Sequence, residues 1–181
     1  CIFCSSSQLY GKKWRARSPE NVIHELRLLR KKYNIREIEF LDDTFTLDRQ
    51  RAKRICELII EERLDISWSA SSRVNTIDAE LASKMKEAGC HTIYLGIESG
   101  SQKILDKCKK GITVEQAIKT VNITHRIGIK VHGYFIIGLV GETKKTIQET
   151  INLAKELPLD FAIFHTAAPY PGTEFYKEVK E

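Results

Sequence analysis

Residues 66–73 read Ile-Ser-Trp-Ser-Ala-Ser-Ser-Arg, and their alternation decides the fold class. Successive side chains of a strand point to opposite faces, so Ile66, Trp68 and Ala70 share one face. Three serines and Arg73 share the other face. The apolar face suits packing against helices, whereas a row of serines that ends in an arginine suits the wall of a polar cavity. The alternative left open is that the serines lie on a solvent-exposed edge of a sheet.

Helix and strand patterns alternate along the rest of the chain. Apolar periodicity predicts strands at residues 35–41, 66–73, 92–97, 130–137 and 161–167. Helical spacing and capping residues predict helices at residues 18–33, 48–62, 78–88, 102–108, 113–126, 143–156 and 173–181. Strands that alternate with helices pair in parallel through right-handed crossovers. Because no glycine-rich dinucleotide turn follows the first strand, the pattern predicts an α/β fold of the TIM-like barrel type, whole or partial, rather than a Rossmann fold.

Size and composition exclude several classes of protein. The 181 residues are 42% hydrophobic and 29% charged, which is typical of one globular domain. No apolar run approaches the roughly 20 residues that span a bilayer, and no signal peptide is visible. Lys and Arg exceed Asp and Glu by 29 to 24, a net charge of +5, with the two signs interspersed. We therefore expect a cytoplasmic protein without a membrane partner, and a nucleic-acid partner is not indicated.

The five cysteines lack the regular framework of a secreted, disulfide-bonded protein. Cys1 and Cys4 are separated by two residues, a spacing that lets both thiolates bind iron in a cluster or zinc. The same spacing occurs in redox dithiols, and two ordinary cysteines at a chain end are a further alternative. Cys56 and Cys90 lie in apolar surroundings and are predicted to be buried. Cys108 lies among lysines and is predicted to lie on the surface.

Polar or glycine-rich segments follow every predicted strand. In parallel α/β barrels the reactive groups gather at the carboxyl ends of the strands. The cysteine segment at residues 1–4 precedes the first helix, so the same topology places it at that rim. The segments are residues 41–45 (LDDTF), 71–73 (SSR), 96–100 (GIESG), 138–142 (GLVGE) and 168–173 (APYPGT).

These segments, in this order, make the chain resemble the radical S-adenosylmethionine (radical SAM) superfamily. It looks most like the branch that is often fused to a cobalamin-binding domain. The resemblance implies a partial (β/α)6 barrel, a [4Fe–4S] cluster held by three cysteines spaced Cys-x3-Cys-x2-Cys, and S-adenosylmethionine bound at the open iron. It rests on residues 1–4 (CIFC), 40–45 (FLDDTF), 96–102 (GIESGSQ), 138–143 (GLVGET) and 169–174 (PYPGTE).

The chain departs from the family pattern at its start. Cys1 and Cys4 match the second and third cluster cysteines, while the first would fall four positions before Cys1. The first barrel strand is missing as well. We therefore expect residues 1–181 to be an N-terminally truncated radical SAM core domain. With two of three ligand thiolates, this fragment alone is predicted to hold no stable cluster and to be inactive.

The resemblance implies a reaction as well as a fold. Reductive cleavage of S-adenosylmethionine at the cluster yields a 5′-deoxyadenosyl radical, which abstracts hydrogen from a substrate that the sequence does not identify. An external electron donor of the flavodoxin or ferredoxin type would supply the electron. A cobalamin in a missing domain is a further expectation. The cofactors carry out the chemistry, and the protein contributes by orienting the reactants and excluding solvent.

The methionine end of S-adenosylmethionine is expected to meet charged side chains. By resemblance, Asp42, Asp43 and Thr44 lie in the motif that meets the amino group, where a carboxylate or a carbonyl accepts from an ammonium. Arg73 is placed to meet the carboxylate, bidentately if the geometry allows. The residues themselves leave plainer roles open. The two aspartates can cap a turn, and Arg73 can pair with an acid of the barrel.

The nucleoside end is expected to meet the later motifs. Glycines allow close approach of the backbone, although Glu142 can simply begin a helix. His132, Tyr134 and His165 have strand positions that can face the barrel lumen, where substrate contact competes with structural roles. By resemblance, the ribose contacts are Glu98 and Ser99, and the adenine contacts are Gly138, Gly141, Glu142 and Ala168.

Two other functions fit parts of the sequence. A zinc-binding or scaffold module would use Cys1 and Cys4 to hold a structural ion with ligands from a partner. A barrel enzyme without a cluster would rely on an acid–base pair and would leave the five segments at the strand ends unexplained. A cysteine four positions before Cys1 in the longer sequence would favour the radical SAM interpretation.

Overall fold

The computed structural model describes residues 1–11 and 13–180 of the chain. Five parallel strands form one sheet in the order β1-β2-β3-β4-β5, so each strand pairs with the strand that precedes it in the chain. This order confirms the predicted α/β fold built from consecutive parallel βαβ units. The strands are β1 (Glu37–Phe40), β2 (Ser67–Ser72), β3 (Cys90–Glu98), β4 (Lys130–Ile137) and β5 (Phe161–Thr166).

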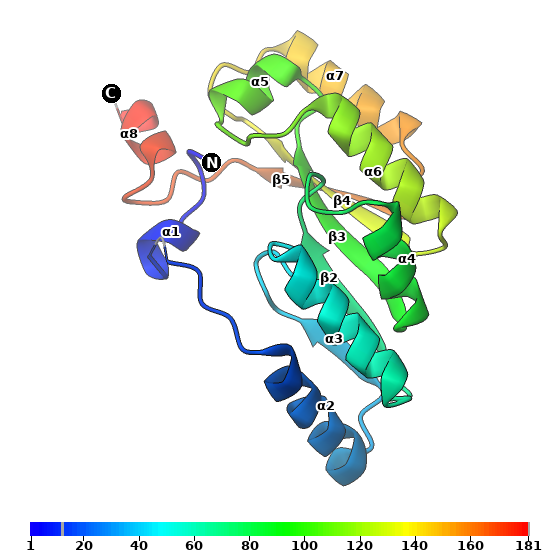
Figure 1. Ribbon diagram of the computed structural model, residues 1–181. Helices are drawn as coiled ribbons and strands as arrows, with labels where there is room; N and C mark the ends of the chain where they lie inside the picture. Colours follow the sequence, from blue (N-terminus) through cyan, green and yellow to red (C-terminus); the bar gives the residue numbers. More distant parts are fainter. Residues whose placement is uncertain (12, 181) are drawn as a thin grey trace.

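Helices cover one face of this sheet. Helices α3, α4, α6 and α7 lie together on that face, while the N-terminal segment and α8 lie apart from them (Figure 1). The short helix α1 was not predicted. The helices are α1 (Ser6–Leu9), α2 (Pro19–Tyr33), α3 (Arg49–Glu61), α4 (Ala79–Glu87), α5 (Gln102–Lys107), α6 (Val114–Arg126), α7 (Lys144–Glu156) and α8 (Glu174–Lys180).

Most helices begin at a capping side chain that can be recognised in the sequence. Ser18 accepts from the backbone N–H of Asn21 ahead of α2, and Asp48 and Asp78 cap α3 and α4 in the same way. Such a cap satisfies an N–H that has no partner inside the helix and stabilises it by about 1 kcal/mol. The predicted helix at residues 173–181 is α8 up to residue 180, and residue 181 lies outside the described residues.

The alternation of strand β2 sorts its side chains as predicted. Trp68 and Ala70 are fully buried against the helices, and the Trp68 indole N–H donates to the carbonyl oxygen of Ala88 at 2.8 Å. Phe40 meets the Trp68 ring edge-on at a centroid distance of 5.2 Å. β2 pairs with β1 and β3, so its serine row lies on an inner strand and not on a sheet edge. Ser71 lines the cavity described below.

A second, smaller hydrophobic cluster joins the N-terminal loop to the body of the domain. Cys108 belongs to it and is 1% exposed, so the prediction of a surface position was wrong. Lys107 and Lys109 are exposed on either side of it, but Cys108, the C-cap residue of α5, packs inward. Cys56 and Cys90 are buried as predicted. The buried members of the cluster are Ile2, Ile104, Cys108, Leu139 and Phe175.

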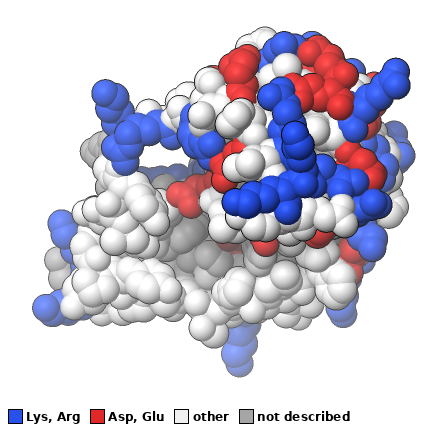
Figure 2. All heavy atoms as spheres, turned by 90° about the horizontal axis from the view of Figure 1, so that it is seen from below, with Lys and Arg blue, Asp and Glu red and all other residues white. Residues whose placement is uncertain are grey.

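Surface charge is mixed. Figure 2 shows Lys and Arg side chains projecting from many points of one face, with Asp and Glu between them and a broad uncharged area in the lower part of the view. Within residues 1–11 and 13–180, no helix is both long enough and apolar enough to cross a bilayer.

Candidate functional site

A cavity of about 490 Å³ opens where the N-terminal loop meets the carboxyl ends of the strands. Four strands contribute to it, together with the loop that carries the first two cysteines. Its lining combines thiols, hydroxyls, charged groups and aromatic rings. The lining residues are Cys1, Phe3, Cys4, Ser6, Asp43, Thr44, Ser71, Ser72, Arg73, Tyr94, Gly96, Glu98, Lys110, Tyr134 and His165.

Ile2 anchors the loop that presents the two thiols. Its side chain is 3% exposed within the second hydrophobic cluster. Its backbone N–H donates to the carbonyl oxygen of Cys108 at 3.0 Å, and its own carbonyl accepts from the N–H of Phe175 at 3.0 Å. The side chains of Cys1 and Cys4 on either side are exposed and unpaired with each other. The loop therefore holds two free thiols at the mouth of the cavity.

Two thiols of this kind fit part of the donor set of an iron–sulfur cluster, which is bound by thiolates. Among the described residues, no three His, Cys, Asp or Glu side chains come together in a group that could hold a metal ion. Cys1 and Cys4 therefore have no third such side chain beside them among the described residues, and their role as cluster ligands stays a prediction.

Arg73 lies at the end of β2, beside the serine row. Its Nη2 donates to the carbonyl oxygen of Lys110 at 2.5 Å, and its Nε donates to the Asn75 side chain at 3.3 Å. Within the described part of the chain it makes no ion pair with a carboxylate. The alternative that Arg73 pairs with an acid of the barrel is therefore wrong. The guanidinium keeps its charge uncompensated at the wall of the cavity.

Glu98 forms a buried ion pair with Lys110, a residue that the sequence analysis did not select. The Lys110 ammonium lies 2.6 Å from Glu98 Oε1, and the two side chains are 7% and 11% exposed. A Cβ on Gly96 would stand 2.5 Å from that carboxylate oxygen, so the missing side chain of Gly96 makes room for the pair. Glu98 adopts φ 68°, an unfavourable region for a residue with a side chain. Such strain is typical of functional positions.

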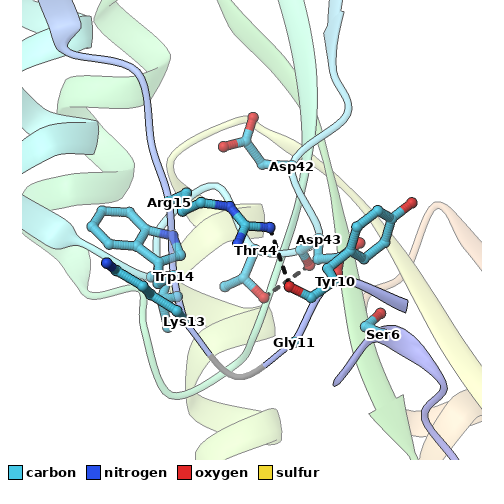
Figure 3. Close-up of a pocket in the computed structure, with 10 residues that line it drawn as sticks. Ser6, Tyr10, Gly11, Lys13, Trp14, Arg15, Asp42, Asp43 and Thr44 are labelled. Carbon is cyan, nitrogen blue, oxygen red and sulfur yellow. Dashed lines mark hydrogen bonds between the residues drawn. The ribbon is translucent and has the colours of Figure 1, made fainter. Parts of the chain in front are cut away.

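The three residues of the motif after β1 all line a second cavity, and two of them also line the first. Asp43 and Thr44 line the cavity with the thiols. Asp42 turns away toward Arg51 of α3, whose guanidinium lies 3.5 Å from its carboxylate. The second cavity, of about 560 Å³, adjoins the first and shares Asp43 and Thr44 with it. Figure 3 shows its lining, with Asp42 pointing away from the other labelled side chains.

Ser99 does not reach the cavity. It is fully buried, its hydroxyl lies 3.1 Å from that of Thr150 on α7, and its oxygen accepts from the N–H of Ser101. The adjacent Gly100 N–H donates to Thr150 at 3.0 Å. The bulge that turns Glu98 toward the cavity therefore turns Ser99 into the interface with α7. We leave the Ser99 side chain out of the candidate cofactor site.

The turn after β4 is stabilised by Glu142. Its carboxylate accepts from the backbone N–H of Gly138 and, at 3.1 Å, from that of Leu139. Its other oxygen is buried without a hydrogen-bond partner among the described residues. Gly138 and Gly141 adopt φ 95° and 81°, which glycine tolerates and other residues do not. Glu142 therefore organises the turn, while the start of α7 is capped by Thr143, whose side chain accepts from the N–H of Thr146.

Ala168 lies in a smaller cavity of about 240 Å³ next to the first. This cavity shares Phe3, Glu98 and His165 with the larger one, so the two cavities adjoin at these side chains. Gly138 is close by, because a Cβ built on it would lie 3.6 Å from Cβ of Ala167. The segments after β4 and β5 therefore meet at one end of the site.

Aromatic side chains form the part of the cavity wall next to the serine row. Tyr94, Tyr134 and His165 line it, and His132 stands below them on the same face of the sheet. Burial lowers the pKa of His132 and raises the pKa of Tyr134, so both side chains favour their neutral forms. The strand positions of His132, Tyr134 and His165 predict that they face the lumen, and Tyr94 follows from the same alternation, two positions before Gly96.

Comparison with known proteins assigns this site to a family. A family model described as the Radical SAM superfamily matches residues 1–154. The chain belongs to the radical SAM superfamily. Members of this family use a [4Fe–4S] cluster and S-adenosylmethionine, so the two cofactors expected from the sequence are confirmed at the level of the family.

Relatives of the chain include proteins named as methyltransferases. An uncharacterized methyltransferase of Pyrococcus horikoshii is 52% identical over 98% of this chain, which covers 39% of that protein. Cytidylyl-2-hydroxyethylphosphonate methyltransferase of Streptomyces wedmorensis is 31% identical over 98% of the chain, which covers 35% of it. The chain thus spans between a third and two fifths of these relatives.

A solved structure has the same fold. The radical S-adenosylmethionine methyltransferase TsrM from Kitasatospora setae, with cobalamin and a [4Fe–4S] cluster bound, superimposes with a TM-score of 0.92 over 99% of this chain and 36% of that protein. The two sequences are 21% identical. Coproporphyrinogen III oxidase from Escherichia coli, also a radical SAM enzyme, gives a TM-score of 0.71. The predicted partial barrel is therefore confirmed as the fold.

Proposed function

We propose that the chain is the cofactor-binding core of a radical SAM methyltransferase. The observation that carries this proposal is one cavity in which two exposed thiols meet the Asp43 carboxylate and the Arg73 guanidinium. Two relatives named as methyltransferases, at 52% and 31% identity, support the reaction class. Activation of the substrate by loss of a hydrogen atom, which the resemblance implies, belongs to the same proposal.

In this proposal Cys1 and Cys4 hold the cluster, and a cysteine four positions before Cys1 in the full-length protein completes the set. The bound cluster supplies a low-potential electron and S-adenosylmethionine supplies the reacting group. Ile2 keeps the two thiols in place through its buried side chain and its two backbone hydrogen bonds. An external donor of the flavodoxin or ferredoxin type delivers the electron, and cobalamin stays a prediction for the full-length protein.

The methionine end of S-adenosylmethionine is a zwitterion, and the cavity offers one group of each sign. Arg73 donates to the carboxylate, and Asp43 accepts from the ammonium. Both side chains stand at the ends of neighbouring strands and neither has an ionic partner within residues 1–11 and 13–180. Asp42 acts indirectly, because its ion pair with Arg51 holds the loop that carries Asp43.

The nucleoside end of S-adenosylmethionine lies toward the smaller cavity that contains Ala168. Glu98, held by Lys110, accepts from the ribose hydroxyls. The turn that contains Gly138 and Gly141, organised by Glu142, allows the backbone to approach the adenine. Ala168 closes the edge of the adenine with its backbone groups.

Anaerobic reconstitution of the full-length protein with iron and sulfide tests this proposal. We expect about four irons per chain at this site and, under reducing conditions, cleavage products of S-adenosylmethionine. Cys1→Ala or Cys4→Ala should abolish the cleavage. Cys56→Ala is the matched control, because Cys56 is buried in α3 away from the cavity. Turnover that persists in the Cys1 or Cys4 variant would refute the cluster assignment.

A further inference from the structure

Five ring side chains form a continuous surface on the inner face of the sheet, here termed the aromatic wall. Register places Tyr94 opposite His132 and His132 opposite Phe161, so the wall crosses three strands. Tyr134 and His165 extend it toward the carboxyl ends of the strands. Such a surface does not arise from the packing of the domain core, which lies on the opposite face with the helices.

The rings of the aromatic wall contact one another in sequence. Tyr94 lies edge-on to His132 with ring centroids 5.2 Å apart, and His132 lies edge-on to Phe161 at 4.7 Å. Tyr94 and Tyr134 are 6.1 Å apart, and Tyr134 stacks on His165 at 5.6 Å with an interplanar angle of 30°. These contacts fix the rings relative to one another, so the wall is ordered before any ligand arrives.

The polar tips of the wall are left open. Among the described residues, no hydrogen bond involves the phenol oxygens of Tyr94 and Tyr134 or the ring nitrogens of His132 and His165. None of these side chains is fully buried, and Tyr94, Tyr134 and His165 face the cavity that holds the thiols. The surface therefore offers ring faces for stacking and free donors and acceptors at their edges.

The remaining walls fix where a ligand lies. Ser71 is the register partner of Tyr94, so its hydroxyl flanks the rings on the same face of the sheet. The Glu98–Lys110 pair occupies the space beside Gly96, which is the register partner of Tyr134. A ligand in this space meets the ring faces, with the Ser71 hydroxyl and the ion pair at their edges. A saturated chain gains little from ring faces and free polar edges, whereas a flat conjugated molecule uses both.

We propose that the aromatic wall binds the substrate through a planar, conjugated ring system that carries polar atoms at its edge. The inference rests on the proposed function, because it places the acceptor of the transferred group in the cavity of the thiols. Stacking on Tyr94 and Tyr134 holds the ring flat against the sheet. The Tyr134 phenol and the imidazoles select its edge atoms. The neutral state of His132, which burial favours, suits this contact.

Binding of two probes of similar size to the full-length, cluster-loaded protein tests the proposal. The probes are 2-naphthol, which is planar and conjugated, and decahydro-2-naphthol, which is saturated and carries the same hydroxyl. Calorimetric or ligand-observed NMR titration under anaerobic conditions gives each Kd. We expect 2-naphthol to bind at least fivefold more tightly. Tyr94→Leu or Tyr134→Leu should raise the Kd of 2-naphthol by about two- to tenfold and leave the Kd of decahydro-2-naphthol unchanged.

Three controls keep the outcomes separate. Phe164→Leu removes a ring from the opposite face of β5, where it stacks on Phe135, and should leave both affinities unchanged. Tyr134→Phe keeps the ring face and removes only the phenol, so it should weaken 2-naphthol binding less than Tyr134→Leu does, and it remains informative if Tyr134→Leu fails to fold. Equal affinity for the two probes, or no effect of either leucine variant, overturns the aromatic wall as a substrate site. Iron content and S-adenosylmethionine binding are measured in the same samples, so a failure of the proposed function is seen independently.

Discussion

The charged residues of the cavity differ in whether they have a partner of opposite charge. Glu98 and Lys110 neutralise each other, whereas Arg73 has hydrogen bonds to a carbonyl and an amide but no carboxylate. A neutral partner leaves the positive charge of Arg73 able to attract an anion. The unpaired arginine and the paired glutamate should therefore respond differently to substitution.

Arg73→Ala should weaken binding of S-adenosylmethionine by about ten- to a hundredfold, because a charge-assisted hydrogen bond is worth about 1.5–3 kcal/mol. Arg73→Lys should restore part of the affinity, since lysine lacks the planar fork. Calorimetric titration of the cluster-loaded protein measures both. Arg49→Ala is the control, because Arg49 pairs with Asp78 and Glu80 at the surface. Parent-like binding by Arg73→Ala would mean that the methionine end lies elsewhere.

Glu98→Gln should lower the free energy of unfolding by about 3–5 kcal/mol, because it leaves the Lys110 ammonium buried without its counter-charge. Adding Lys110→Met should recover most of this loss. Urea denaturation measures both variants. Lys84→Met, which breaks an exposed pair with Glu87, should cost less than about 1 kcal/mol. A single Glu98 variant as stable as the parent would contradict the burial of the pair.

At the scale of the elements, two features position the site. The N-terminal loop is held by Ile2, which links it to α5 and α8. The connection from α4 to β3 turns at Gly89, beside the start of β2. In each case a single residue, Ile2 or Gly89, makes the contact that holds the segment in place.

Ile2→Ala should release the cysteine loop without unfolding the domain. Removing a buried isoleucine costs about 2–5 kcal/mol, which would raise the opening equilibrium of the loop by roughly thirtyfold or more. Hydrogen exchange at the amides of Ile2 and Phe175, whose N–H groups cross this contact, reports the opening. Leu9→Ala in exposed α1 is the control. Unchanged exchange in Ile2→Ala would show that the backbone hydrogen bonds alone anchor the loop.

Gly89→Ala should destabilise the domain more than Gly128→Ala does. Both glycines end a helix at positive φ, 92° and 85°, so both substitutions carry a similar conformational cost of about 1 kcal/mol. A Cβ at Gly89 would also stand 2.4 Å from the carbonyl oxygen of Ile66, whereas at Gly128 it meets the flexible end of Lys86 at 3.7 Å. Denaturant unfolding compares them, and equal losses would mean that β2 shifts without cost.

At the scale of the whole molecule, buried thiols link stability to pH. Burial raises the pKa of Cys56 to about 12 and that of Cys108 to about 11, and it raises the pKa of Cys90 as well. An unfolded cysteine titrates near 8.5. Below that pH both states are protonated and the stability is fully present. Above it the unfolded state loses protons first, so the free energy of unfolding falls as pH rises toward the folded pKa.

Cys56→Ala should make the free energy of unfolding fall less steeply as the pH rises. One thiol contributes about 1.4 kcal/mol per pH unit between roughly pH 9 and the folded pKa, and the variant lacks that contribution. Denaturant titrations of the iron-free protein from pH 7 to pH 11 give the slopes. Leu9→Ala, which changes an exposed side chain without a titratable group, should keep the parent slope. Identical slopes for Cys56→Ala and the parent would contradict the raised pKa.

The sequence by itself determined the order of helices and strands, the two faces of β2 and the family. Periodicity and capping are local, so residues 66–73 and the caps at Ser18 and Asp78 could be interpreted without a structure. The motifs at the strand ends also predicted that the site lies at the carboxyl ends of the strands. The prediction of a surface Cys108 failed because a local run of lysines does not reveal which side of a short helix is covered.

Only the tertiary structure decided how the site residues are used. Asp43 and Thr44 line both cavities, whereas Asp42 lines one of them and pairs with Arg51 of α3. Ser99 turns toward Thr150 of α7, and Lys110 reaches back to Glu98 from beyond α5. Each of these contacts joins separate elements whose distance depends on how the whole sheet and its helices pack. Charge pairing and hydroxyl packing across such distances follow from the folded arrangement, and no local pattern of the sequence encodes them.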